Sequence, residues 1–192
     1  MNILKGLTSI AVAGLVATVI TGCGEQPQPN QEVQGCTIEG AKAKQWVCSP
    51  VVDGAIADIG SAPRSSAGIG FQRRVALANA RSNLAQQIES KVKDKVETFT
   101  RATGIGEGES VDAVATSVSK QVAKVTLRGS KQVDSWQSPS GTLYLLVAVP
   151  EKTVNESAKQ AVKSSFKNDK ALWQQFQSKQ ALDSLEKEFP TE

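Results

Sequence analysis

The sequence predicts an α+β domain in which a small antiparallel sheet with a C-terminal hairpin packs against a long helix, followed by extra C-terminal helices. Two observations support this prediction. Apolar residues recur at helical spacing between residues 77 and 99. Two candidate strands, 130–137 and 142–149, are joined by Ser-Pro-Ser-Gly, a sequence typical of a type I turn, and so form a predicted hairpin. Strands that adjoin a hairpin and carry helices on one face are typical of an antiparallel sheet.

The first elements of the domain are two strands and the long helix. Segments 45–52 and 55–61 are strand-like, and the helix begins between Ala67 and Phe71 and runs to about Ala102. Alanines are frequent in its first half, and such small side chains let a helix lie close against a sheet. Its apolar stripe consists of Leu77, Leu84, Ile88, Val92, Val96 and Phe99.

A second helix and the hairpin follow the long helix. Ser110 is a good N-cap for the second helix, and Gly129 stands where its C-terminal cap is expected. In the second hairpin strand both alternating faces are apolar. This strand is therefore expected to be central or covered on both sides. Pro150 ends it and suits the first turn of a third helix.

The last part of the chain carries large apolar side chains on two sides of a predicted helix. The third helix is expected over 151–166, and a fourth begins at residue 168 or 169 and ends near 189. We interpret the C-terminal helix, 168–192, as an addition to a 36–167 domain and as a surface joining one copy to another. A helix that packs only on its own domain normally needs a single apolar stripe, whereas this one has apolar residues on two sides. The alternative is that the helix docks onto its own domain. The surface residues are Trp173, Phe176, Leu182, Leu185 and Phe189.

Residues 1–22 form a predicted lipoprotein signal peptide. The uncharged run 6–20 follows Lys5 and is too short, at about 1.5 Å per residue, to cross a hydrocarbon core of about 30 Å. Ile20-Thr21-Gly22-Cys23 then matches a bacterial lipobox. This match implies cleavage before Cys23 and lipidation of its thiol and new amino terminus, for example with palmitate. Two or three acyl chains hold a protein stably on a membrane.

The segment after the lipidated cysteine is expected to be a tether on the outer membrane. Gly24 replaces the Asp that commonly retains such lipoproteins at the inner membrane, so the rule for these proteins implies delivery to the outer membrane, on its periplasmic side. Residues 23–35 are rich in Pro, Gln and Asn and cannot bury a core. Fully extended, this tether spans about 40 Å, and as a flexible coil it typically spans about 20 Å, so the folded part can stand off the membrane surface.

Two cysteines remain in the mature body, Cys36 and Cys48. The periplasm is oxidising, so we expect them to form a disulfide. A loop of this length would contribute about 3 kcal/mol. A free redox pair is the alternative, but the spacing is not Cys-x-x-Cys.

The composition excludes several classes of function. The chain of 192 residues has no His, which removes His bases and most zinc sites, and its net charge of +3 is too weak to indicate nucleic-acid binding. The glycines at 104, 106 and 108 follow a helix and lack a Walker lysine, so we interpret them as a helix connection. We therefore expect no enzymatic activity, no cofactor and no metal.

Segment 64–101 has a local excess of positive charge. It holds eight basic residues against three acidic ones. An ordinary solvated face is the simpler interpretation. Contact with acidic lipid headgroups or with an acidic neighbour is the alternative.

Several short motifs together resemble the LPP-twenty family of bacterial lipoproteins. They are the lipobox, Trp46-Val47, Asp58-Ile59-Gly60-Ser61-Ala62, Ala76-Leu77-Ala78-Asn79-Ala80-Arg81, Val133-Asp134-Ser135-Trp136, Gly141 and Tyr144-Leu145-Leu146-Val147. The resemblance implies an envelope lipoprotein without known catalysis, and some relatives are associated with the flagellum. Two functions remain open: a structural or assembly role with a homo-oligomer or envelope protein as partner, and a tethered binding module that contacts or activates a cell-wall enzyme.

Overall fold

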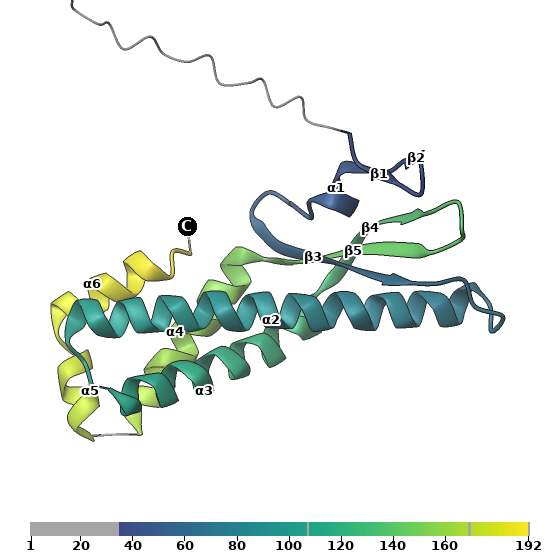
Figure 1. The fold of residues 1–192 in the computed structure, drawn as a ribbon. Coiled ribbons are helices and arrows are strands. Elements are labelled where there is room, and N and C mark those ends of the chain that lie inside the picture. Colours follow the sequence, from purple (N-terminus) through teal and green to yellow (C-terminus); the bar gives the residue numbers. More distant parts are fainter. Residues whose placement is uncertain (1–34, 107, 169, 192) are drawn as a thin grey trace, which may run out of the picture. The chain divides into compact units, whose positions relative to one another are not determined.

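The computed structural model describes residues 35–106, 108–168 and 170–191, which belong to one folded unit (Figure 1). The signal peptide, the lipobox and the tether up to residue 34 lie outside the described residues. In chain order the elements are β1 (Thr37–Ile38), β2 (Ala41–Lys42), α1 (Gln45–Cys48), β3 (Ala55–Ala62), α2 (Ile69–Thr103), α3 (Glu109–Thr126), the 3-10 turn η1 (Leu127–Gly129), β4 (Lys131–Gln137), β5 (Leu143–Pro150), α4 (Glu151–Lys167), α5 (Lys170–Phe176) and α6 (Lys179–Glu188). The predicted α+β class is confirmed.

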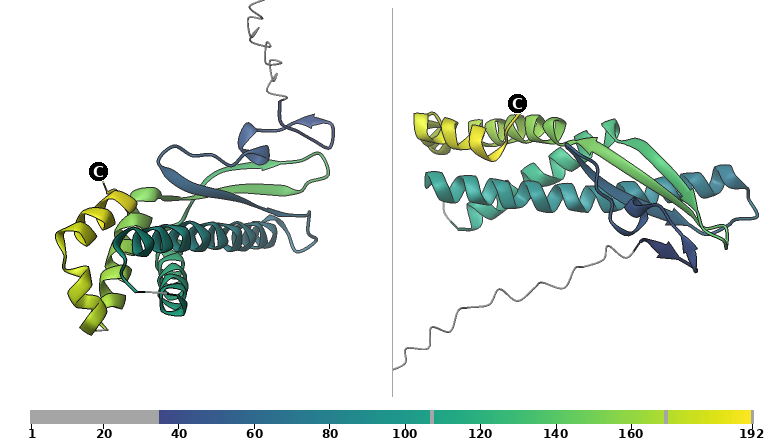
Figure 2. Two further views of the ribbon diagram at one scale, coloured as in Figure 1. Left: turned by 60° about the vertical axis from the view of Figure 1, so that its left-hand side comes forward. Right: turned by 90° about the horizontal axis from the view of Figure 1, so that it is seen from above.

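The main sheet is antiparallel and has the order β3-β5-β4, so β5 is central as predicted. One face of β5 packs with α2, through residues such as Leu145 and Val147. The other face, with Tyr144 and Leu146, packs against the segment that contains β1, β2 and α1. The sheet therefore lies between α2 and this N-terminal segment (Figures 1 and 2).

A close approach of backbones joins α2 to the sheet. Gly60 of β3 faces Ala76 and Ala80, both fully buried, and a Cβ added at Gly60 would lie under 3.0 Å from the backbone of these two alanines. Only a residue without a side chain fits at this position. The alanines in the first half of α2 thus allow the helix to lie close against the sheet, as the sequence predicts.

Helix α2 also covers the free edge of β3. The side-chain amides of Asn79 and Asn83 donate to the carbonyl oxygens of Ser61 and Ile59, each at 2.9 Å. These amides are four residues apart on the helix, while their acceptors are two apart on the strand, so one helix face follows the strand edge. An edge strand with engaged carbonyl groups is a poor template for pairing with another chain.

Two expectations about where helices form and begin are wrong. Residues 45–48 form a short helix rather than a strand, because Val47 is buried under the sheet while the chain turns to bring Cys48 to Cys36. The second helix begins one residue before Ser110 and is preceded by Gly108, which caps it without a side-chain bond.

The predicted fourth helix is two helices. The chain turns after α5, and Ser178 begins α6 by accepting a hydrogen bond from the backbone N–H of Ala181 at 3.2 Å. This break lets Phe176 and Leu185 reach the same core, which a straight helix with two apolar sides could not do.

Candidate functional site

The N-terminal segment, residues 35–52, lies on the face of the sheet opposite α2, which we call the outer face, and Asp134 is the first of two carboxylates that fasten it to the rest of the domain. Asp134 lies on β4, where a bulge shifts the register: Gln132 pairs with Val147, and Asp134 pairs with Leu146. The extra residue is Val133, which is 52% exposed. Because side chains alternate along a strand, the bulge decides that Asp134 shares the outer face with Leu146.

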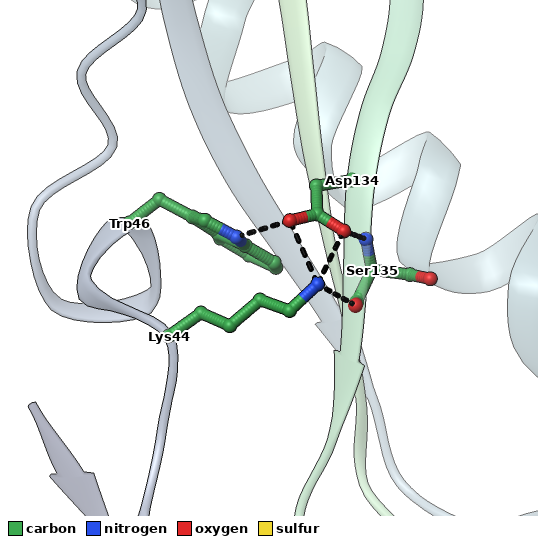
Figure 3. A network of polar contacts seen from close by, with 4 residues as sticks. All are labelled: Lys44, Trp46, Asp134 and Ser135. Atoms are coloured by element: carbon green, nitrogen blue, oxygen red, sulfur yellow. Dashed lines mark hydrogen bonds and ion pairs between the residues drawn. The ribbon is translucent and has the colours of Figure 1, made fainter.

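Asp134 accepts hydrogen bonds from three groups (Figure 3). Lys44 Nζ lies 2.6 and 2.8 Å from its two carboxylate oxygens, and Trp46 Nε1 lies 2.8 Å from one of them. The backbone N–H of Ser135 donates to the other at 2.7 Å, and Lys44 also donates to the Ser135 carbonyl at 3.3 Å. We call Lys44, Trp46, Asp134 and Ser135 the Asp134 clasp.

The Asp134 clasp lowers the pKa of its carboxyl group. The bond from Lys44 contributes most, and the Ser135 N–H and the Trp46 indole add to it, so the pKa of Asp134 lies below its ordinary value of 3.8. A carboxylate with both oxygens bonded and a lowered pKa is a weak base. The arrangement is suited to holding two segments together.

A second carboxylate fastens the same segment to the β4–β5 turn. Glu39 accepts from the Ser140 N–H at 2.8 Å, from the Ser140 hydroxyl at 2.7 Å and from the Ser138 hydroxyl at 3.0 Å. The Ser140 hydroxyl is the main cause of a lowered Glu39 pKa. Glu39 has φ +53°, an uncommon conformation for a residue with a side chain, and these bonds hold it there.

The predicted disulfide between Cys36 and Cys48 is confirmed, with Cα atoms 5.7 Å apart. It joins the residue before β1 to the end of α1 and so closes the N-terminal segment into a loop. Cys36 is buried beside Trp46, Trp136 and Tyr144. The disulfide therefore closes the segment into a loop, while the clasp and the Glu39 contacts fasten that loop to β4 and to the β4–β5 turn.

The C-terminal residues proposed as a contact surface are largely inside this domain, which corrects that interpretation. Phe176, Leu185 and Phe189 are at most 1% exposed and belong to the core cluster with Phe99 and Phe166. The physical reason is the break between α5 and α6, which turns both apolar sides inward.

The two remaining members of that surface differ from each other. Trp173 is half-buried and stacks on Phe176, with ring centroids 5.4 Å apart, and Lys167 Nζ lies 5.3 Å from the centre of its indole. Leu182 is 41% exposed. The structure thus brings together four of the five residues and leaves one on the surface.

Polar contacts also fasten the tail. Lys95 lies 5.5 Å from the Phe189 ring centroid and donates to Asn155 at 3.1 Å, and burial lowers the pKa of Lys95. Asn155 donates to the Pro190 carbonyl at 2.8 Å, and Lys159, on the same helix, pairs with Glu186. These contacts tie α6 to α2 and α4.

Sequence reasoning found some of these residues and missed others. Trp46 and Asp134 stand in the motifs that carry the family resemblance, whereas Lys44 and Glu39 had no signal. Their partners lie about a hundred residues along the chain, at separations of 90 and 101 for Asp134 and Ser140. No local pattern encodes such a pairing.

No group of His, Cys, Asp and Glu that could hold a metal ion occurs within 35–106, 108–168 and 170–191. In the same described ranges, no helix has both the length and the apolar character needed to cross a membrane.

A disulfide-closed segment held on an α+β domain is typical of proteins that mature outside the reducing cytoplasm. A family model, the LPP20 lipoprotein, matches residues 45–150, which cover more than half of the chain. The chain therefore belongs to the LPP20 lipoprotein family, and it is a lipoprotein of the cell envelope. No curated protein matches the chain. The matched region contains both Trp46 and Asp134, while α4, α5 and α6 follow it.

Acid is expected to open the Asp134 clasp. The folded pKa values of Asp134 and Glu39 are lowered, so their contribution is complete above the ordinary values of 3.8 and 4.5 and is lost as the pH falls through the lower folded values. The Trp46 indole N–H signal in NMR should shift in this acid range. Asp134→Asn keeps an acceptor but loses the ion pair, so the signal should be displaced already at neutral pH. Asp183→Asn on α6 is the control, and equal displacement in both variants would contradict the assignment.

Proposed function

We propose that the protein is lipid-anchored to the outer membrane through Cys23, faces the periplasm, and has a structural or assembly role in the cell envelope. The family match is the observation that supports this proposal, because the matched lipoprotein region, 45–150, follows a lipobox and a short tether in the sequence. Gly24 after the cysteine supports the outer membrane as its destination, by the sorting rule for such lipoproteins.

The geometry of the domain favours a structural role over a catalytic one. The most engaged carboxylates, Asp134 and Glu39, use their oxygens to hold the N-terminal segment in place. Function is argued from a site, and here the polar network joins parts of the fold to each other. We therefore propose a protein without catalysis or cofactor.

Cys23→Ser tests the anchor. The variant should lose labelling by radioactive palmitate and should leave the outer-membrane fraction, because the thiol that carries the lipid is gone. Cys36→Ser/Cys48→Ser is the matched control and should keep the label, since these cysteines form the internal disulfide. A Cys23→Ser protein that is still labelled and still sediments with outer membranes would refute the proposal.

A further inference from the structure

The start of α2 and the loop before it form an exposed end that combines apolar and cationic groups. Ile69 is 58% exposed and Phe71 is 44% exposed, and the side chains of Arg64 and Arg74 are also exposed. The Arg74 guanidinium lies 5.9 Å from the centre of the Phe71 ring. Arg64 and Phe71 line the same hollow of about 330 Å³. We call Arg64, Ile69, Phe71 and Arg74 the Phe71 tip.

No ion pair of the described residues involves the two arginines of the Phe71 tip. The sequence contains no Asp or Glu between Ile59 and Ile88. In each described ion pair the cation is a lysine. The charged carboxylate of Glu39, on the N-terminal segment, is bonded to Ser138 and Ser140 of the β4–β5 turn rather than to either arginine.

The Phe71 tip lies at the end of the domain where the described chain begins. Glu39 of the N-terminal segment bonds to Ser140 in the β4–β5 turn, and a Cβ added at the next residue, Gly141, would lie 3.2 Å from the Arg64 side chain. The Gly141 carbonyl also accepts a 2.7 Å bond from Gln72 of α2. Figure 1 shows that β1, the β4–β5 turn and the start of α2 lie toward the same end of the folded domain.

We propose that the Phe71 tip docks on anionic lipid headgroups of the membrane that carries the anchor. Arginines bind phosphate oxygens in a bidentate manner, and an exposed aromatic ring and an exposed aliphatic side chain at one end of a helix fit the boundary between headgroups and acyl chains. The tether spans about 20 Å as a coil and about 40 Å when fully extended, so the start of the domain stays within that distance of the surface, and the Phe71 tip can reach it. This inference rests on the proposed anchor for that proximity, but the contact itself belongs to the folded domain.

Vesicle sedimentation with the unlipidated body, residues 24–192, tests the contact. The body should bind vesicles in which about a third of the phosphatidylcholine is replaced by phosphatidylglycerol, should bind pure phosphatidylcholine much less, and should be released by salt. Arg64→Gln/Arg74→Gln should weaken binding about twenty-fivefold, since each basic residue near an anionic surface contributes about a factor of five. Ile69→Ser/Phe71→Ser should weaken it as well.

Matched controls use residues of the same kind elsewhere on the surface. Arg101→Gln/Arg128→Gln removes two exposed arginines, and Val51→Ser/Leu182→Ser removes two exposed apolar groups, which are 72% and 41% exposed. Both controls should bind vesicles like the parent, and circular dichroism should show that all variants fold.

Several outcomes would overturn the inference. They are no binding of the parent body to anionic vesicles, equal losses in tip and control variants, or a loss of binding to isolated cell wall or to another protein while vesicle binding is unchanged. Palmitate labelling of Cys23 without vesicle binding by the body would remove this inference alone. Vesicle binding by the body, with no labelling of Cys23 in the full chain, would remove the proposed anchor alone.

Discussion

Gly60→Ala should destabilise the domain by about 3 kcal/mol or more, and Gly60→Val should leave it unfolded at 37 °C. Overpacking of a well-packed site costs about 1–3 kcal/mol when side chains can yield. Here the obstructing atoms belong to the backbone at Ala76 and Ala80, so the whole of α2 must move from β3. A domain with a free energy of unfolding of about 5–15 kcal/mol loses a large fraction of its stability in this way.

Denaturant midpoints by circular dichroism measure the effect of Gly60→Ala. Gly129→Ala is the matched control, because a Cβ at Gly129 meets nothing within 4 Å. It should change the free energy of unfolding by less than about 0.5 kcal/mol. Similar midpoints for both variants would show that α2 is not held close to β3 at Gly60.

Hydrophobic periodicity correctly predicted the elements whose buried faces can be read from their own sequence. The stripe from Leu84 to Phe99 is fully buried as expected, since a helix of this length needs one continuous apolar face and has one. The two apolar faces of β5 likewise placed it in the centre of the sheet, with Val147 and Leu146 covered from opposite sides.

What the sequence could not predict depends on contacts between distant residues. Residues 45–48 have strand-like composition, but the disulfide and the burial of Val47 set their conformation. The partners Lys44 and Asp134 meet only because a bulge at Val133 turns Asp134 to the outer face. A bulge changes the face of every later residue in a strand, and composition alone does not reveal where it occurs.

In the C-terminal tail, residues 168–192, the sequence pattern predicted an exposed surface where the structure has a buried core. Two apolar sides on one predicted helix indicated an exposed surface and contact between copies. The turn before Ser178 removes that conflict, because each short helix then presents its own apolar side to the core. The sequence pattern showed that the tail is amphipathic, but it did not show that the tail forms two short helices instead of one long helix.

Deleting residues 168–192 should therefore unfold the domain rather than leave its core intact. The deletion removes Phe176, Leu185 and Phe189, which are fully buried around Phe99 and Phe166. Loss of a single buried phenylalanine costs about 3–5 kcal/mol, so the loss of three large buried side chains exceeds the stability of an ordinary domain. Thermal melting of the truncated body should show no cooperative transition.

Point variants separate the packing of the tail from its other effects. Phe189→Ala should lower the free energy of unfolding by about 3–5 kcal/mol, since it empties a core position and removes the ring beside Lys95. Leu182→Ala, at an exposed position of the same tail, should change it by less than about 1 kcal/mol. Light scattering gives the mass of each variant. A truncated body that melts like the parent but has a lower mass would show that the tail joins copies of the protein, because a segment that completes its own core cannot be removed without loss of stability.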